Sequence, residues 1–330
     1  MKIRVLGAGV YGSHIALALI AAGHDVDVHE VSGRLFNGAS GNGPARCHLG
    51  PHYPRSLVTR AACQEHTRLF EARYGHLTSG VPINLYAIAH ESLVDFGTYR
   101  KILRDEIEFI TVSRLDQYGL INVEGAIHCG ERHFVVDKAR EWFTKELGNH
   151  VTLNQPPGRV DDARWDWTID CSFCANDETG VDRFEACITV LIEGPVDKSI
   201  TIVDGKFPGL YVWNEEKGLT SVTSAKYTPM ARYPKWSEAR AFLDDLSVAD
   251  IERQSEDMVD QMAVYYPRVR DEYKIVGHLL AVRALPKSAS DARLVDVIRV
   301  GERAIRVRAG KIDAIFQAEE IIKKMISEAA

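Results

Sequence analysis

Residues 1–30 read MKIRVLGAGVYGSHIALALIAAGHDVDVHE, and this stretch decides the fold. The apolar segment 1–6 predicts a short strand, and the small residues of 13–22 predict a helix that ends at Gly23. Val26 and Val28 alternate with polar residues, so 24–29 predicts a second strand. Together these segments indicate a β-α-β unit of the usual length, about 30 residues.

The turn between the first strand and the helix carries the spacing Gly7-x-Gly9-x-x-Gly12. In such a turn the first glycine permits the tight bend, the second lets a pyrophosphate approach the backbone, and the third allows close helix–strand packing. The helix start favours phosphate charge, and a carboxylate ending the second strand can bind a ribose. The sequence therefore favours a dinucleotide over a ligand-free glycine turn. Its expected contacts are Gly7, Gly9, Val10, Tyr11, Gly12 and Glu30.

The composition is that of an ordinary globular protein. The chain has 330 residues, of which 45% are hydrophobic and 26% charged, and its net charge is −6. These values exclude a disordered, collagen-like or coiled-coil protein, and they do not call for a polyanionic partner. No signal peptide is visible, and the apolar run 15–22 is too short to span a bilayer. We expect a soluble, cytoplasmic protein that does not bind membranes.

Strand–helix alternation lies at the two ends of the chain, and short strands separated by turns lie in the middle. This order predicts an α/β fold, with a Rossmann-like nucleotide-binding domain and an inserted, mainly antiparallel β lobe. Asp137 is the expected N-cap of a helix over 138–147. We expect the nucleotide-binding domain to be discontinuous, over 1–74, 125–180 and 276–330. The substrate lobe would then comprise 75–124 and 181–275.

The glycine-rich loop after the second strand is too long to be only a connection. Over residues 38–55 it reads GASGNGPARCHLGPHYPR. Ser40, Gly41 and Asn42 offer backbone N–H groups to phosphate, and Arg46 can neutralise phosphate or donate hydrogen bonds to another part of a cofactor. Basic residues outnumber acids by six to three between Met1 and Arg60. A phosphate cradle explains this excess, although a solvated face remains an alternative.

Two sets of residues have spacings that suit metal ligands. His48 and His52 are four apart, but the intervening Gly50 and Pro51 argue against a helix that would bring them together. Cys171 and Cys174 form a C-x-x-C with no second pair to complete a zinc site. We therefore expect no metal at either place.

With the glycine motif ahead of it, this loop resembles the D-amino-acid oxidase / glycine oxidase superfamily of FAD enzymes, which has a GR2-type FAD-binding domain. Three further segments resemble that superfamily: Glu131–Asp137 before the central helix, Ile169–Ser172 at a strand end, and Gly310–Asp313 before the last helix. The chain is short for the superfamily and lacks the usual glycine oxidase form of the second motif. The resemblance therefore implies a fold and a cofactor, but it does not specify a substrate.

The resemblance implies that FAD is the cofactor and suggests which residues surround it. Beyond the glycine turn and Glu30, the expected FAD contacts are Arg34, Ser40, Gly41, Asn42, Arg46, Cys47, His48, Pro156, Cys171, Gly310, Lys311 and Ile312. The expected catalytic residues are His48, His52, Tyr53 and Arg283. Arg283 would bind a substrate carboxylate with its planar guanidinium. Tyr211, Trp213 and Tyr227 would form walls of the substrate pocket, although an aromatic core explains them equally well.

The chemistry implied by the resemblance is oxidation of a C–N bond in an amino acid or glycine-like amine. Hydride would pass to flavin N5, the imine would hydrolyse, and oxygen would reoxidise the flavin. Three alternatives stay open. The amine could be a glycyl or aminoacyl group on a nucleobase of DNA or RNA, the substrate could be a 2-hydroxy acid, or the chain could be a non-catalytic flavoprotein.

Overall fold

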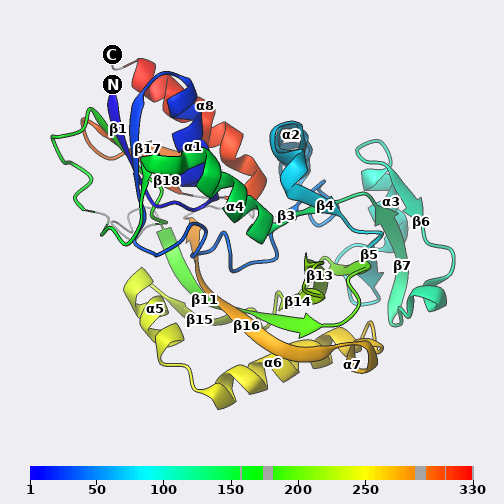
Figure 1. The fold of residues 1–330 in the computed structure, drawn as a ribbon. Helices are drawn as coiled ribbons and strands as arrows, with labels where there is room; N and C mark the ends of the chain where they lie inside the picture. The colour runs from blue at the N-terminus through cyan, green and yellow to red at the C-terminus, as the bar shows by residue number, and fades with distance from the viewer. Residues whose placement is uncertain (157, 174–180, 287–294, 309, 329–330) are drawn as a thin grey trace.

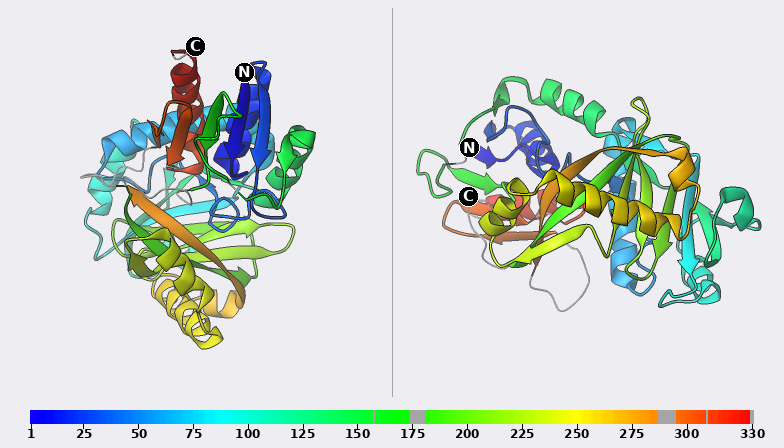
Figure 2. Two further views of the ribbon diagram at one scale, coloured as in Figure 1. Left: turned by 90° about the vertical axis from the view of Figure 1, so that its left-hand side faces the viewer. Right: turned by 90° about the horizontal axis from the view of Figure 1, so that it is seen from below.

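The computed structural model describes residues 1–156, 158–173, 181–286, 295–308 and 310–328. Two units, each built on its own sheet, lie against one another (Figure 1). Both chain termini lie side by side in the first unit, as the two further views in Figure 2 also show. The middle of the chain forms the second unit, so this unit is inserted into the first.

The first unit is built on a six-stranded sheet with the order β17-β18-β10-β1-β2-β9. Its strands are β1 (Lys2–Leu6), β2 (Asp25–His29), β9 (Val151–Thr152), β10 (Trp167–Asp170), β17 (Asp296–Arg299) and β18 (Ala304–Arg308). Neighbouring strands are parallel, except that β17 runs antiparallel to β18. Strands covered on both faces read as apolar runs, and Ile3, Arg4, Val5 and Leu6 of β1 are all buried.

Helices pack on this sheet or beside it and complete its apolar core. They are α1 (Val10–Ala21), α2 (Leu57–Tyr74), α4 (Val136–Leu147) and α8 (Ile315–Ser327), with short 3₁₀ turns η1 (Gly75–Leu77), η3 (Gly148–His150) and η4 (Ile312–Ala314). Helix α1 packs against both α4 and α8, and its small residues Gly12 and Ala16 are buried. Ser56 caps α2 by accepting a hydrogen bond from the Thr59 N–H, as N-cap serines commonly do.

The second unit is a strongly bent sheet with the order β15-β11-β14-β13-β12-β5-β7-β6, and β16 pairs with β11. Its strands are β5 (Ile83–Ala89), β6 (Phe109–Thr111), β7 (Val123–Cys129), β11 (Val181–Glu193), β12 (Lys198–Val203), β13 (Pro208–Asn214), β14 (Leu219–Ser224), β15 (Pro229–Tyr233) and β16 (Lys274–Pro286). Pairing is antiparallel except between β5 and β12.

One face of this second sheet is covered by helices, and the other turns toward the first unit (Figure 1). The covering helices are α5 (Trp236–Asp244), α6 (Val248–Ala263) and α7 (Val269–Glu272), and α3 (Phe96–Leu103) with η2 (Leu115–Tyr118) lies near β6 and β7. Leu210 and Val222 point into the core beneath α6, together with Met258 and Met262 of that helix. Strand residues alternate between faces, so Tyr211 lies on the opposite face, toward the first unit.

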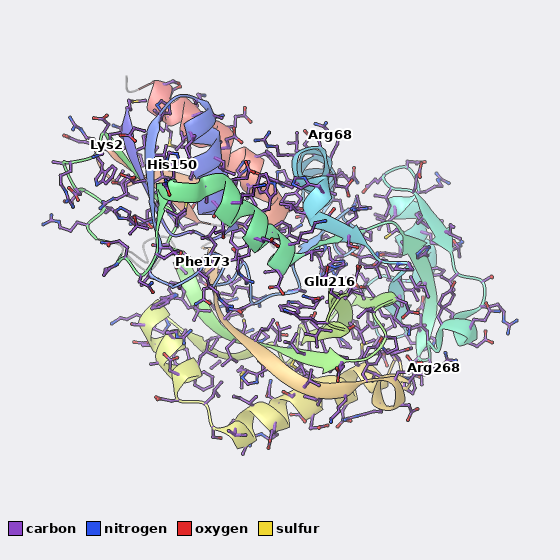
Figure 3. The ribbon with its side chains drawn as sticks, in the orientation of Figure 1. Lys2, Arg68, His150, Phe173, Glu216 and Arg268 are labelled. Atoms are coloured by element: carbon purple, nitrogen blue, oxygen red, sulfur yellow. The ribbon has the colours of Figure 1, made fainter. Side chains whose placement is uncertain are left out.

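A small three-stranded sheet joins the two units. It consists of β3 (Arg46–Cys47), β8 (Arg132–Phe134) and β4 (Thr78–Gly80), in the order β3-β8-β4. Strand β3 comes from the glycine-rich loop, and β8 directly follows the turn at the end of β7. Phe173, just beyond β10, lies where the first unit meets β11 and β16 (Figure 3). The glycine-rich loop is therefore held between the two units.

The α/β architecture with an antiparallel lobe is as the sequence predicts, but two details differ. The predicted nucleotide-binding ranges include 125–129 and 276–286, whereas backbone pairing places β7 and β16 in the second sheet. Asp137 is not the N-cap of α4, because the helix begins at Val136 with Val135 as N-cap. Asp137 instead accepts hydrogen bonds from Asn214 and Lys217 of the second unit. Cys174 lies outside the described residues.

No helix in the described ranges is long and apolar enough to cross a membrane.

Candidate active site

The glycine turn leaves room for a ligand to approach the protein backbone at the start of α1. Gly7 has φ +92, a conformation that only glycine adopts easily, and a Cβ at Gly12 would lie 1.9 Å from the Gly7 carbonyl oxygen. Gly9 is the N-cap of α1 and provides no side-chain cap. The helix start therefore has backbone N–H groups directed toward a site where an anion is favoured.

Glu30 lies beside this turn, at the end of β2. Its side chain is buried, and its two oxygens accept hydrogen bonds from the Ala8 N–H at 2.7 Å and the Ser32 N–H at 2.8 Å. The remaining lone pairs can accept from ribose hydroxyls. Pro156 follows Gln155, whose N–H donates to the Glu30 carbonyl, so this exposed proline is close to the same end of the site.

The glycine-rich loop folds back over the start of α1. Ser40 Oγ accepts a hydrogen bond from the Val10 N–H at 3.0 Å. Gly41 is buried so tightly that a Cβ would lie 2.1 Å from the Phe36 carbonyl oxygen. Asn42 donates to the Asn37 carbonyl, and Arg34 is exposed with its Nε donating to Asn37 Oδ1. The arrangement of Gly9, Val10, Glu30 and Ser40 fits the pyrophosphate and ribose of a dinucleotide.

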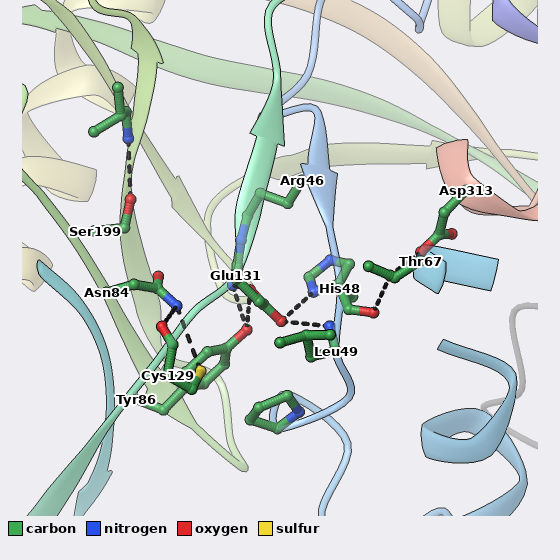
Figure 4. A network of polar contacts seen from close by, with 12 residues as sticks. Arg46, His48, Leu49, Thr67, Asn84, Tyr86, Cys129, Glu131, Ser199 and Asp313 are labelled. Carbon is green, nitrogen blue, oxygen red and sulfur yellow. Dashed lines mark hydrogen bonds and ion pairs between the residues drawn. The ribbon is translucent and has the colours of Figure 1, made fainter. Parts of the chain in front are cut away.

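Arg46 belongs to a buried polar network that is centred on Glu131 (Figure 4). Its Nη2 is 2.5 Å from Glu131 Oε2 and also donates to the Tyr86 hydroxyl, which itself donates to Glu131 at 2.6 Å. The guanidinium lies 4.1 Å from the centre of the Tyr211 ring. Burial lowers the pKa of Arg46, but Tyr86 and Glu131 outweigh it and raise the pKa well above its ordinary value. The arginine is therefore permanently charged and paired with a protein acid.

Glu131 also holds the loop that follows Arg46. Its Oε1 accepts a hydrogen bond from the Leu49 N–H at 2.8 Å and lies 3.8 Å from His48 Nδ1. A carboxylate so placed connects the backbone of the cofactor loop to the second sheet through Tyr86. Glu131 is not among the site residues predicted from the sequence, although it begins one of the segments, Glu131–Asp137, that resemble the superfamily.

His48, His52 and Tyr53, which the sequence analysis proposes as catalytic residues, lie together in the structure. Their ring centres are 5.8 Å apart for the two histidines and 4.9 Å for His52 and Tyr53. The segment 48–56 forms turns and no helix. Lys311, from the distant C-terminal turn, places its Nζ 3.9 Å from the centre of the Tyr53 ring. Two expected site segments, far apart in the chain, therefore meet at this ring cluster.

The C-terminal turn is fixed against α1 and α2. The Tyr11 hydroxyl donates to the Lys311 carbonyl at 2.5 Å, and the Lys311 Nζ donates to Cys63 Sγ. Asp313, two residues later, is completely buried and contacts Thr67. Gly310 and Ile312 flank Lys311 in this turn. The predicted cofactor residues Tyr11 and Lys311 are thus in direct contact.

Arg283 of β16 lies directly opposite Glu185 of β11, which is buried. Its Nε is 2.9 Å from Glu185 Oε2, and Arg232 of β15 approaches the other carboxylate oxygen, also at 2.9 Å. Burial raises the pKa of Glu185, but the two arginines outweigh it and hold the pKa below its ordinary value. Tyr53 interacts electrostatically with Arg283. One carboxylate therefore holds two arginines, with a net positive charge near the ring cluster.

The other predicted residues have different surroundings. Cys47 is buried in β3, and Cys171 packs with its Cβ beside the glycine turn, 3.3 Å from where a Gly12 Cβ would stand. Trp213 is half-buried, and its Nε1 has no hydrogen-bond partner among the described residues. Tyr227 packs with the core beneath α6, and Gln254 of α6 donates to its carbonyl. The structure does not bring Tyr227 to the Arg46 and Tyr53 clusters, because it lies in the turn after β14 on the α6 side.

The chain is similar to known proteins over nearly its whole length. The FAD-dependent monooxygenase FPY4 of Fusarium mangiferae is 32% identical over 339 residues, which cover 99% of this chain and 91% of FPY4. No protein-family model matches the chain.

Solved structures with the same fold include glycine oxidase from Geobacillus kaustophilus, with a TM-score of 0.71 and 11% identity over 99% of this chain and 95% of the oxidase. Iminodiacetate oxidase from Chelativorans sp. BNC1 has a TM-score of 0.70 and 11% identity, over 96% of this chain and 93% of that protein. These structures have the fold of the D-amino-acid oxidase superfamily. Given its identity to FPY4, the chain belongs to the family of FAD-dependent oxidoreductases that includes FPY4, and FAD is its cofactor.

Proposed function

We propose that this enzyme oxidises the C–N bond of a small amine that carries a carboxylate, and that oxygen is its electron acceptor. The observation that carries this proposal is the pair of arginines, Arg283 and Arg232, held by the single acid Glu185 at the edge of the ring cluster. Glycine oxidase and iminodiacetate oxidase, whose names specify such substrates, share the fold.

The charge at Arg283 suits a carboxylate ligand. Two guanidinium groups around one carboxylate leave one positive charge uncompensated by Glu185. Glu185 contacts Nε and Nη2 of Arg283, so Nη1 is left without a hydrogen-bond partner among the described residues. The side chain of Arg283 is 35% exposed, enough to admit a ligand while retaining much of its electrostatic strength. Arginine binds carboxylates through parallel N–H groups, which fixes the orientation of a substrate as well as its charge.

The remaining residues have supporting roles in this proposal. When bound, FAD supplies the two-electron oxidation. Gly7, Gly9, Glu30 and Ser40 would hold its dinucleotide part, and Lys311 and Tyr53 would lie near its reacting end. The substrate nitrogen must be neutral for C–N oxidation. The apparent affinity of the enzyme for the amine should therefore depend on the pKa of that amine. His48 and His52 stand in the cluster where that nitrogen would be enclosed.

The test is an anaerobic screen in which the holoenzyme is mixed with candidate substrates and the visible flavin absorbance is followed. Amino acids, iminodiacetate, 2-hydroxy acids and glycyl-modified nucleosides form its four arms. The proposal predicts bleaching by members of the first two arms, with release of ammonia or a primary amine. Bleaching by hydroxy acids alone, or by modified nucleosides alone, would contradict it.

The printed name of FPY4 favours a second candidate function, monooxygenation of the substrate. An oxidase reduces oxygen to peroxide, whereas a monooxygenase transfers one oxygen atom to the product. Turnover under isotopically labelled dioxygen separates the two. Unlabelled product with stoichiometric peroxide supports the oxidase, and labelled product supports the monooxygenase.

A further inference from the structure

Thr67 of α2 lies between two hydrogen-bond acceptors from distant parts of the chain. Its Oγ1 is 2.8 Å from the carbonyl oxygen of His48 and 3.3 Å from Asp313 Oδ2. Thr67 and Asp313 are 1% and 0% exposed, so water does not compete for these contacts. Through Thr67, the turn that leads into α8 is connected to the backbone of the His48 loop (Figure 4).

The number of protons available to these three groups determines which of them donates each hydrogen bond. A threonine hydroxyl has one proton to donate, and a backbone carbonyl can only accept. The Thr67 hydroxyl is placed to donate to either oxygen, and the shorter contact places its one proton on the His48 carbonyl. In that arrangement Asp313 forms a hydrogen bond with Thr67 Oγ1 only if the carboxyl of Asp313 is the donor. Only the protonated carboxyl can donate. Asp313 Oδ1 has no hydrogen-bond partner among the described residues, which a neutral carboxyl tolerates better than a buried charge.

We propose that Asp313 is a proton-holding positioning residue, whose protonated carboxyl fixes the backbone of His48 through Thr67. When the carboxyl ionises, the Thr67 hydroxyl turns to the new carboxylate, and the His48 carbonyl loses its donor. The His48 loop then loses this connection to the C-terminal turn, and it keeps its contacts with Glu131 and with Lys311. This inference concerns the protein and its bound cofactor, and it does not depend on which substrate is oxidised.

Several charged or titratable groups surround Asp313. Lys311 lies on its own segment and Glu131 on the turn before β8, while Tyr11 of α1, Cys47 of β3 and Cys63 of α2 also interact with it electrostatically. Burial raises the pKa of Asp313 to about 6, although Lys311, a backbone N–H and the Thr67 hydroxyl each lower this pKa. The connection to His48 is therefore made below about pH 6 and lost as the pH rises through that value.

Infrared spectroscopy of the holoenzyme tests the protonation state directly. Wild-type protein should show a protonated-carboxyl C=O band that disappears as the pH is raised from about 5 to about 8 around the pKa of Asp313. The Asp313→Asn variant should lack that band. A band that persists unchanged in Asp313→Asn, or a wild-type spectrum without it at the acid end, would overturn the proposal.

Visible circular dichroism of the bound flavin tests the connection to the His48 loop. The wild-type signal should change over the same pH range, and Thr67→Ser, which keeps the hydroxyl, should behave alike. Asn at position 313 can still donate to Thr67, so Asp313→Asn should retain the acid-form signal at every pH, whereas Thr67→Val should show the alkaline-form signal at every pH. If Asp313→Asn does not bind FAD, a comparison of Thr67→Ser with Thr67→Val still tests whether the flavin signal depends on the Thr67 hydroxyl. A transition that survives in Thr67→Val refutes the connection.

Discussion

Arg46 Nη2 lies 2.5 Å from Glu131 Oε2, although the two residues are 85 positions apart in the chain. This buried ion pair joins the loop after the glycine motif to the turn between β7 and β8. Glu131 also accepts from Leu49 and Tyr86, so one carboxylate connects the cofactor loop, β5 and the small sheet. The pair therefore sets the position of the loop that carries His48.

Replacing Glu131 by glutamine should destabilise the protein and weaken FAD binding. The change leaves the Arg46 charge buried without a counter-ion, which typically costs about 3–5 kcal/mol. Chemical unfolding and the fraction of FAD retained after gel filtration measure the two effects. Glu141→Gln, on the exposed side of α4, is the matched control and should behave as wild type. Equal stability of the two variants would show that the pair does not support the loop.

Gly12→Ala should yield protein that binds FAD at least ten times more weakly. The added Cβ would stand 1.9 Å from the Gly7 carbonyl oxygen, so the turn has to open. Fluorescence titration of apoprotein with FAD measures the affinity. Gly277→Ala, where a Cβ meets no heavy atom within 4 Å, should bind FAD normally. If both variants bind alike, the glycine turn is not the site that holds the cofactor.

Arg283→Lys should raise the KM for amines that carry a carboxylate by roughly 10- to 100-fold, because lysine keeps the charge but loses the bidentate geometry. This range corresponds to about 1.5–3 kcal/mol, the usual strength of a charged hydrogen bond. The kcat/KM for a matched amine without the carboxylate should hardly change. A similar loss for both amines would indicate a structural role for Arg283 beside Glu185.

Glu319 makes the stability depend on pH at the acid end. Its carboxylate lies 2.8 Å from His14 Nε2, and the hydrogen bond from His14 is the main reason that its pKa falls from 4.5 to about 2. Because the pKa of Glu319 is lower in the folded than in the unfolded protein, its carboxylate adds to the free energy of unfolding above pH 4.5. This contribution is lost as the pH falls toward 2. We expect Glu319→Gln to lose about 2 kcal/mol at neutral pH, after allowance for partial exposure.

The same variant should show a flatter stability profile below pH 5 than the wild type. Urea unfolding at a series of pH values measures both curves. Curves that run parallel between the unfolded and folded pKa values would show that Glu319 does not carry this acid dependence.

Local sequence signals predicted the first unit well. The strand of residues 1–6, the glycine turn, Glu30 and the helix that follows the turn each depend on residues close together in the chain, and the structure has all of them. The closeness of His48, His52 and Tyr53 also follows from the sequence, because six consecutive residues of one loop contain all three.

Features that depend on pairing between distant segments were not predictable in this way. Nothing near Arg46 in the sequence indicates that Glu131 is its partner, and Arg283 could not be paired with Glu185 without the register of β11 and β16. Tyr227 seemed to continue the alternation of Tyr211 and Trp213, but a turn intervenes and places it beneath α6. Asp137 had the character of an N-cap, yet contacts from Asn214 and Lys217 across the units take up its carboxylate.

The most direct test of the central claim is an anaerobic single-turnover measurement that compares wild type with Arg283→Lys on one carboxylate-bearing amine. We predict that the wild-type flavin bleaches in one phase with one equivalent of imine-derived product. The variant should bleach to the same extent but need a much higher amine concentration. Wild-type flavin that stays oxidised with every amine tested, while a 2-hydroxy acid reduces it, would contradict the proposed reaction.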